Sequence, residues 1–133
     1  MEPSKTHLAP GVLAFFLALA GVLSSTATPI ISEFLADNES GLRDEDGDWE
    51  DWLELYNPDS EPADLGGHFL TDNPDNLTKW RIPDGTSLQP RGFLVIFASG
   101  KDRAIPGQQL HTSFGLDNSG ESVSYTHLRA HET

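Results

Sequence analysis

The chain has 133 residues, which is enough for one domain of ordinary size after a short N-terminal segment of different composition. It carries 21 acidic and 8 basic side chains, a net charge of −13, so nucleic-acid phosphates would be repelled and we exclude DNA and RNA as partners. It contains no cysteine, which excludes a disulfide framework, a thiolate metal site and a cysteine nucleophile.

The N-terminal segment has the pattern of a cleavable export signal. Lys5 precedes an apolar run from Leu8 to Leu23, and small residues follow, with Ser25 and Ala27 at the positions that a signal peptidase recognises. The run is shorter than the roughly 20 apolar residues of a spanning helix, and no basic cluster follows it. We therefore predict a signal peptide over residues 1–27, no stable membrane span, and a protein that is secreted or displayed at the cell surface.

After Pro29 the apolar residues occur in short runs separated by Gly, Pro, Asp and Asn, which is an all-β pattern. Short runs of this kind in a chain of about 100 residues are typical of a sandwich of two packed sheets. The predicted strands are Ile30–Ala36, Trp52–Tyr56, His68–Thr71, Lys79–Ile82, Phe93–Ala98, Leu110–Phe114 and Glu121–Tyr125.

The strand at residues 52–56 carries large apolar groups on both faces, so we expect it to be central. Two glycines, Gly66 and Gly67, precede the next strand and indicate a bulge, a close backbone approach or a flexible bend. The predicted core consists of Ile31, Phe34, Leu53, Leu55, Phe69, Leu70, Trp80, Ile82, Leu94, Ile96 and Phe114.

An acidic loop, residues 44–51, is the segment with the most pronounced chemistry. Asp44, Asp46 and Asp48 alternate so that their carboxylates can converge on one hard cation, and we add Asp51 as a fourth ligand of a calcium site. The spacing differs from that of an EF-hand, because Leu55 stands where the twelfth-position glutamate would be. The alternative is a solvated acidic loop without an ion, since runs of like charge are usually exposed.

Several segments in order resemble the bacterial lamin-tail domain. They are ISEFLA at residues 31–36, DGDWEDWLELYNP at 46–58, DLGG at 64–67, LTD at 70–72, Trp80 with PDG at 83–85, GFLVIFAS at 92–99, LHT at 110–112 and GE at 120–121. The resemblance implies an immunoglobulin-like β-sandwich without catalytic activity. It also implies a bacterial setting, within a large exported protein whose other domains would be partners of this one.

The C-terminal residues 125–133 depart from the family pattern and resemble translated adapter sequence at the end of a metagenomic fragment. We therefore predict a lamin-tail-like sandwich over residues 28–124 that lacks its last strand, followed by a non-native tail. The histidines at 127 and 131 are four residues apart, as metal ligands on a helix are, but we do not predict a zinc site there, because the tail is expected to be non-native and the chain has no cysteine.

The sequence favours a non-catalytic module that binds or positions, because none of the usual nucleophile, zinc-protease or phosphate-loop motifs is present. The expected ligand is an extracellular protein or polysaccharide, and Trp49 or Trp52 could stack on sugar rings. A structural spacer is the second hypothesis. A carboxylate-dependent hydrolase is the third, with Glu33, Glu54 and Asp72 as the acidic candidates.

Overall fold

The computed structural model of the protein describes residues 27–118 and 123–126. Every regular element in these two ranges is a β-strand, and the prediction of an all-β chain is confirmed. The strands are β1 (Ile30–Leu35), β2 (Trp52–Tyr56), β3 (Ala63–Asp64), β4 (Phe69–Thr71), β5 (Trp80–Arg81), β6 (Ser87–Leu88), β7 (Phe93–Phe97), β8 (Leu110–His111) and β9 (Ser124–Thr126).

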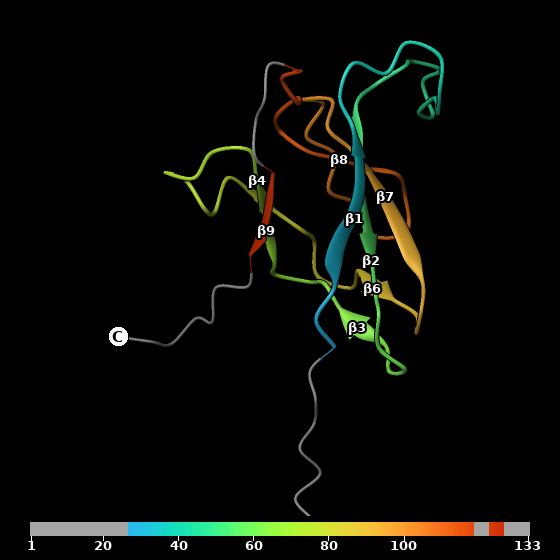
Figure 1. Cartoon of the computed structure of the whole chain (residues 1–133), viewed down its shortest axis with the longest axis vertical. Coiled ribbons are helices and arrows are strands. Elements are labelled where there is room, and N and C mark those ends of the chain that lie inside the picture. The colour runs from blue at the N-terminus through green and yellow to red at the C-terminus, as the bar shows by residue number, and fades with distance from the viewer. Residues whose placement is uncertain (1–26, 119–122, 127–133) are drawn as a thin grey trace, which may run out of the picture.

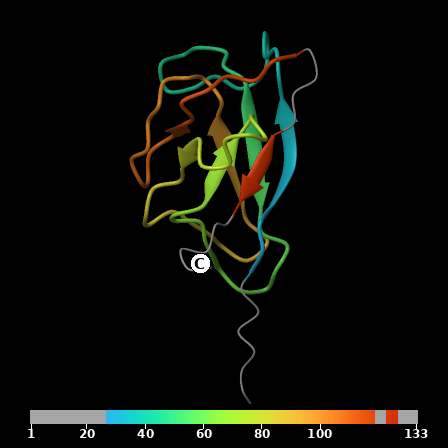
Figure 2. The same cartoon turned by 90° about the vertical axis from the view of Figure 1, so that its left-hand side faces the viewer.

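The strands form three sheets. The main sheet has the order β1-β2-β7-β8, the second sheet has the order β5-β4-β9, and β3 pairs with β6 in a small sheet. All pairings are antiparallel except that of β7 with β8. Figure 1 shows the main sheet on one side, β4 and β9 on the other and the small sheet at the base. Figure 2 turns the molecule so that β4 and β9 lie in front of the main sheet. This arrangement is consistent with an immunoglobulin-like sandwich.

Strand β2 shows why this sequence forms a central strand. Leu53 and Leu55 are fully buried, while the side chains that alternate with them are partly exposed on the other face. β2 pairs with β1 on one edge and with β7 on the other, so its predicted central position is confirmed.

The core lies between the main and second sheets. Its buried apolar side chains are Leu53, Leu55, Ala63, Leu65, Leu70, Trp80, Ile82, Leu88, Ile96, Leu110 and Phe114, and Ile31 and Leu94 pack against them while partly exposed. Most of the predicted core is thus confirmed. Phe69 is only partly buried.

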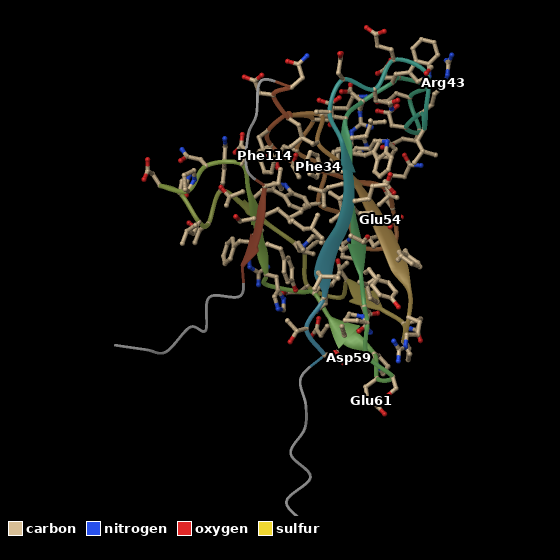
Figure 3. All side chains as sticks on the ribbon, in the orientation of Figure 1. Phe34, Arg43, Glu54, Asp59, Glu61 and Phe114 are labelled. Atoms are coloured by element: carbon tan, nitrogen blue, oxygen red, sulfur yellow. The ribbon has the colours of Figure 1, made fainter. Side chains whose placement is uncertain are left out.

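The prediction that Phe34 belongs to the core was wrong. Phe34 stands opposite the buried Leu53, on the side of β1 that faces Phe114, yet its side chain is 55% exposed (Figure 3). Over residues 27–118 and 123–126, the second sheet leaves more than half of this residue exposed. β1 is an edge strand within the described residues, and its register shifts between Ile31 and Glu33, which marks a bulge.

The glycine pair after β3 makes a close backbone approach. A Cβ atom on Gly66 would lie 3.0 Å from the Cα atom of Asp84, and Gly67 has a φ of +82°, a conformation that glycine adopts at little cost. This contact holds the turn after β3 against the turn before β6. Of the three alternatives for this glycine pair, the structure shows the close backbone approach, which leaves no room for a side chain at Gly66.

The predicted signal peptide lies outside the described residues except for Ala27, which packs against the core. Residues 127–133 of the predicted tail also lie outside them, whereas Tyr125 and Thr126 belong to β9. Across residues 27–118 and 123–126, no helix is long and apolar enough to cross a membrane.

Candidate functional site

The acidic loop connects β1 to β2 and folds back on itself through Asp44. The Asp44 amide donates to the Asp48 carbonyl at 3.0 Å, and the Asp44 carboxylate accepts hydrogen bonds from the amides of Asp46 and Asp48 at 3.0 and 2.9 Å. Short acidic side chains favour such turns because they reach amides two residues further on. Asp44 is consequently buried while Asp46 and Asp48 remain exposed.

Three of the four predicted metal ligands converge. Carboxylate oxygens of Asp44, Asp46 and Asp48 all lie within 4.8 Å of one another. The fourth, Asp51, is elsewhere: its carboxylate accepts a hydrogen bond from the Asn38 amide at 3.1 Å. The alternating spacing therefore identified the cluster, but Asp51 does not belong to it.

The ammonium group of Lys101 lies in the middle of this cluster. Its Nζ donates to Asp44 Oδ2, to Asp46 Oδ2 at 2.9 Å and to Asp48 Oδ2 at 2.8 Å, with Glu50 Oε1 at 3.8 Å. Lys101 comes from the segment between β7 and β8, more than fifty residues away in the chain. A side-chain cation thus stands where a hard metal ion was predicted.

Two further basic side chains hold the loop against the main sheet. Arg103 contacts Glu45 at 2.6 Å and Asp46 at 2.8 Å, and His111 Nε2 lies 2.8 Å from Glu45 Oε2. His111 is fully buried and stacks on Phe97, with ring centroids 5.3 Å apart. We name Lys101, Arg103 and His111, with their carboxylate partners Asp44, Glu45, Asp46 and Asp48, the loop clamp.

The clamp lowers the pKa values of its carboxyl groups. Burial alone would raise the pKa of Asp44, but hydrogen bonds from Lys101 and from the loop amides outweigh it and lower that pKa. Arg103, followed by Lys101, lowers the pKa of Asp46 from 3.8 to about 2. The hydrogen bond with His111 is the main cause of the lowered pKa of Glu45. Burial lowers the pKa of Lys101, but its three carboxylate partners outweigh this and raise it overall, so the ammonium stays charged.

Ser99, His111 and Glu45 form a relay that resembles a hydrolase triad in its connectivity. Ser99 Oγ lies 2.8 Å from His111 Nδ1, and His111 Nε2 lies 2.8 Å from Glu45. However, the imidazole is fully buried, and Ser99 Oγ already accepts the Lys101 amide at 3.1 Å. Through Glu45, the relay holds the acidic loop against the main sheet.

A cavity of about 550 Å³ opens beside the acidic loop. Its walls include Trp49, Asn38 and the carboxylates of Asp37, Asp51 and Asp117. The Trp49 side chain is 48% exposed, and the Arg43 guanidinium lies over its ring, 4.1 Å from the centroid. Among the described residues that line the cavity three are acidic and none is basic, although Arg43 covers one face of Trp49, so the cavity favours ligands that donate hydrogen bonds or carry positive charge.

Of the three carboxylates that were considered for a hydrolase, two lie side by side and the third lies in the other sheet. Glu33 and Glu54 are direct neighbours across β1 and β2, whereas Asp72 follows β4 in the second sheet and pairs with Lys79 at 2.7 Å. Trp52, the other candidate for sugar stacking, is partly buried on β2.

A family model described as Lamin Tail Domain matches residues 23–129. The chain belongs to the lamin tail domain family. The resemblance seen in the sequence is thereby confirmed, and the family is one of immunoglobulin-like modules, in agreement with the layers described above. No curated protein and no solved structure matches the chain.

Proposed function

We propose that this lamin tail domain is a non-catalytic binding module of an exported, modular protein, and that it binds polysaccharide at the loop end of the sandwich. The observation that carries the proposal is the Trp49-walled cavity beside the clamped acidic loop. Export is supported by the apolar segment before Ala27 and its small-residue cleavage pattern.

The chemistry of the cavity suits sugar rings. The face of the Trp49 indole that Arg43 does not cover offers an apolar surface for the C–H groups of a sugar. The carboxylates around it can accept hydrogen bonds from hydroxyl groups, and the amide of Asn118 can donate to them. Because the clamp engages the neighbouring carboxylates internally, the rim of the cavity is held in place before a ligand arrives. Loops at one end of a rigid sandwich are a common location for binding sites.

A retention assay tests the proposal. The full chain is mixed with insoluble cellulose, chitin and peptidoglycan, and the bound fraction is measured after washing. We expect retention on at least one polymer, abolished in Trp49→Ala and unchanged in the control Ile105→Ala, which removes an equally exposed apolar side chain elsewhere. Absence of retention on all three polymers would favour the spacer hypothesis.

We also propose that calcium binds the loop only in competition with Lys101. Asp44, Asp46 and Asp48 provide three convergent carboxylates, which is the donor set that calcium prefers. The ammonium of Lys101 contacts all three, so an ion at this position must displace it.

A further inference from the structure

The outer face of the main sheet, turned away from the second sheet, carries an unusual set of side chains. Ile30, Tyr56 and Phe93 form one row across β1, β2 and β7, and Glu33, Glu54 and Val95 form the next row. The register gives both rows directly, because residues paired across strands project to the same face. Figure 3 shows Glu54 on the side of β2 that faces away from β4 and β9.

The first row is apolar and exposed. Phe93 is 60% exposed and Ile30 is 48% exposed. Tyr56 and Phe93 stack with ring centroids 4.5 Å apart and planes inclined by 24°. In contrast, Phe97 and His111, which lie further along the same face, are buried where Glu45 of the acidic loop reaches the sheet. The loop therefore leaves the lower part of the face open.

The second row contains two carboxylates without a cation. Glu33 and Glu54 stand directly opposite each other, an arrangement that destabilises a sheet when both are charged. The hydroxyl of Ser32 donates to Glu54 at 2.8 Å, but among residues 27–118 and 123–126 no basic side chain forms an ion pair with either glutamate. The carboxylates of the loop clamp, by comparison, each have a basic partner.

The charge of this face decides what can cover it. A second copy of the chain, docked face to face, would place glutamates against glutamates, and an anionic membrane surface would be repelled by the net charge of −13. An apolar protein surface would bury two unpaired carboxylates at a large desolvation cost. A partner that supplies a positive charge removes this cost and is attracted over a longer range.

We propose that the outer face around Glu33, Glu54 and Phe93 binds a protein segment that carries an arginine or lysine between apolar side chains. The cation lies against the two carboxylates, and the neighbouring apolar groups pack on Ile30 and on the Tyr56–Phe93 pair, whose rings also attract a guanidinium. This inference rests on the proposed function in treating the chain as a binding module, but it uses a different surface from the Trp49 cavity.

The test is an NMR titration of the isotope-labelled full chain with two synthetic peptides. The first has the sequence Val-Thr-Val-Arg-Val-Thr-Val, and its twin carries citrulline, which has the shape of arginine without the charge. Three proteins are compared: the unchanged chain, Glu33→Gln with Glu54→Gln, and a control with the same change in charge, Glu61→Gln with Asp75→Asn, at two exposed positions in the loops that follow β2 and β4.

We expect the arginine peptide to shift the amide signals of Glu33, Glu54 and Phe93 saturably. The Glu33→Gln, Glu54→Gln chain should bind about fivefold more weakly, and the control no more than about twofold, because two partly exposed ion pairs are lost only in the first case. Phe93→Ser, which keeps the charge, should also weaken binding.

The proposal is overturned if the citrulline peptide binds equally well, if both double variants bind alike, or if the shifted signals lie in the acidic loop. Each spectrum also reports whether its variant is folded, so loss of binding cannot be confused with unfolding. None of these results affects retention on polysaccharide through Trp49, so the failure of this inference and the failure of the proposed function are distinguishable.

Discussion

Lys101 is the residue on which the acidic loop depends most directly. Its ammonium contacts Asp44, whose carboxylate is fully buried, together with Asp46 and Asp48. Removing a cation from a buried carboxylate leaves that charge unpaired at low dielectric, which costs several kcal/mol in a fully buried pair and less here because the lysine side chain is partly exposed.

We therefore expect Lys101→Met to lower the free energy of unfolding by about 2 kcal/mol, measured by chemical denaturation at neutral pH. The matched control is Lys79→Met, which removes a lysine whose ion pair within the described residues is with Asp72 alone and whose ammonium lies 5.2 Å from the centroid of the Phe114 ring; it should cost less than about 1 kcal/mol. Equal losses in the two variants would mean that Lys101 is an ordinary surface lysine.

The same substitution should reveal calcium binding. In the unchanged chain the ammonium competes with the ion, so millimolar calcium should raise the Tm only slightly. In Lys101→Met the ammonium no longer competes for the three carboxylates, although Arg103 still contacts Asp46, and we expect a clear rise that disappears with chelator, because a ligand that binds only the folded state stabilises it. The rise should also disappear when Asp46→Ala and Asp48→Ala are added. If Lys101→Met shows no rise, the calcium proposal is wrong.

Asp46 gives the clamp a defined dependence on pH. Its pKa in the folded chain is about 2, below the ordinary 3.8, because Arg103 and Lys101 stabilise the carboxylate. A carboxyl group whose pKa is lowered on folding stabilises the protein above its unfolded pKa, and this contribution is lost as the pH falls through the folded pKa. We expect the free energy of unfolding to decline between pH 4 and pH 2, less steeply in Asp46→Asn. An NMR titration of the Asp46 carboxyl with a midpoint near 3.8 would contradict this assignment.

Among the elements, β2 and β1 differ in how much of their apolar surface contributes to the core. Leu55 on β2 is fully buried, whereas Phe34 on β1 is 55% exposed. Leu55→Ala should therefore destabilise the domain by about 3 kcal/mol, since it removes buried methylene groups and leaves a cavity. Phe34→Ala should cost less than about 1 kcal/mol despite the larger side chain, as is usual for exposed positions. Thermal or chemical unfolding of both variants checks the contrast, and a large loss in Phe34→Ala would show that this ring is covered.

These elements also show how far sequence reasoning reaches. Strand β2 was predicted with its bounds because a short run rich in large apolar residues lies between the acidic loop and the turn-forming residues that begin at Asn57. β3 and β6 were missed because each is two residues long, one apolar and one polar, whereas the equally short β5 and β8 lie inside longer runs that were predicted as strands. Phe34 follows the apolar pattern of its strand, but its exposure depends on how far the second sheet extends, which no local pattern records.

In the candidate site, too, some residues could be predicted from the sequence and others could not. The convergence of Asp44, Asp46 and Asp48 could be predicted because it follows from spacing within five residues. Lys101 could not, because it reaches the loop from a segment more than fifty residues away. The one available signal was the occurrence of Lys101 and Arg103 two residues apart in a strongly acidic chain. The pairing of Glu33 with Glu54 likewise required the register of β1 on β2.

At the scale of the whole molecule, the net charge of −13 means that acidic side chains repel one another over the surface, while the ion pairs of the loop clamp attract. Repulsion between distant surface charges is screened by salt within a Debye length of about 8 Å at physiological ionic strength. The clamp pairs are in direct contact, at 2.6 to 2.9 Å where Arg103 and Lys101 meet Glu45, Asp46 and Asp48, and close pairs are screened much less than distant charges.

Salt should therefore stabilise this acidic domain. We expect the free energy of unfolding to rise as sodium chloride increases from about 0.01 M to about 0.15 M, because the screened repulsion outweighs the weakened clamp. The rise should be larger in Lys101→Met, whose loop carboxylates repel one another without a central cation. Denaturant unfolding at several salt concentrations measures both slopes. If the free energy of unfolding of the unchanged chain fell with salt, the clamp ion pairs would stabilise the fold by more than the repulsion among acidic side chains destabilises it. The acidic loop would then be the main electrostatic support of the fold.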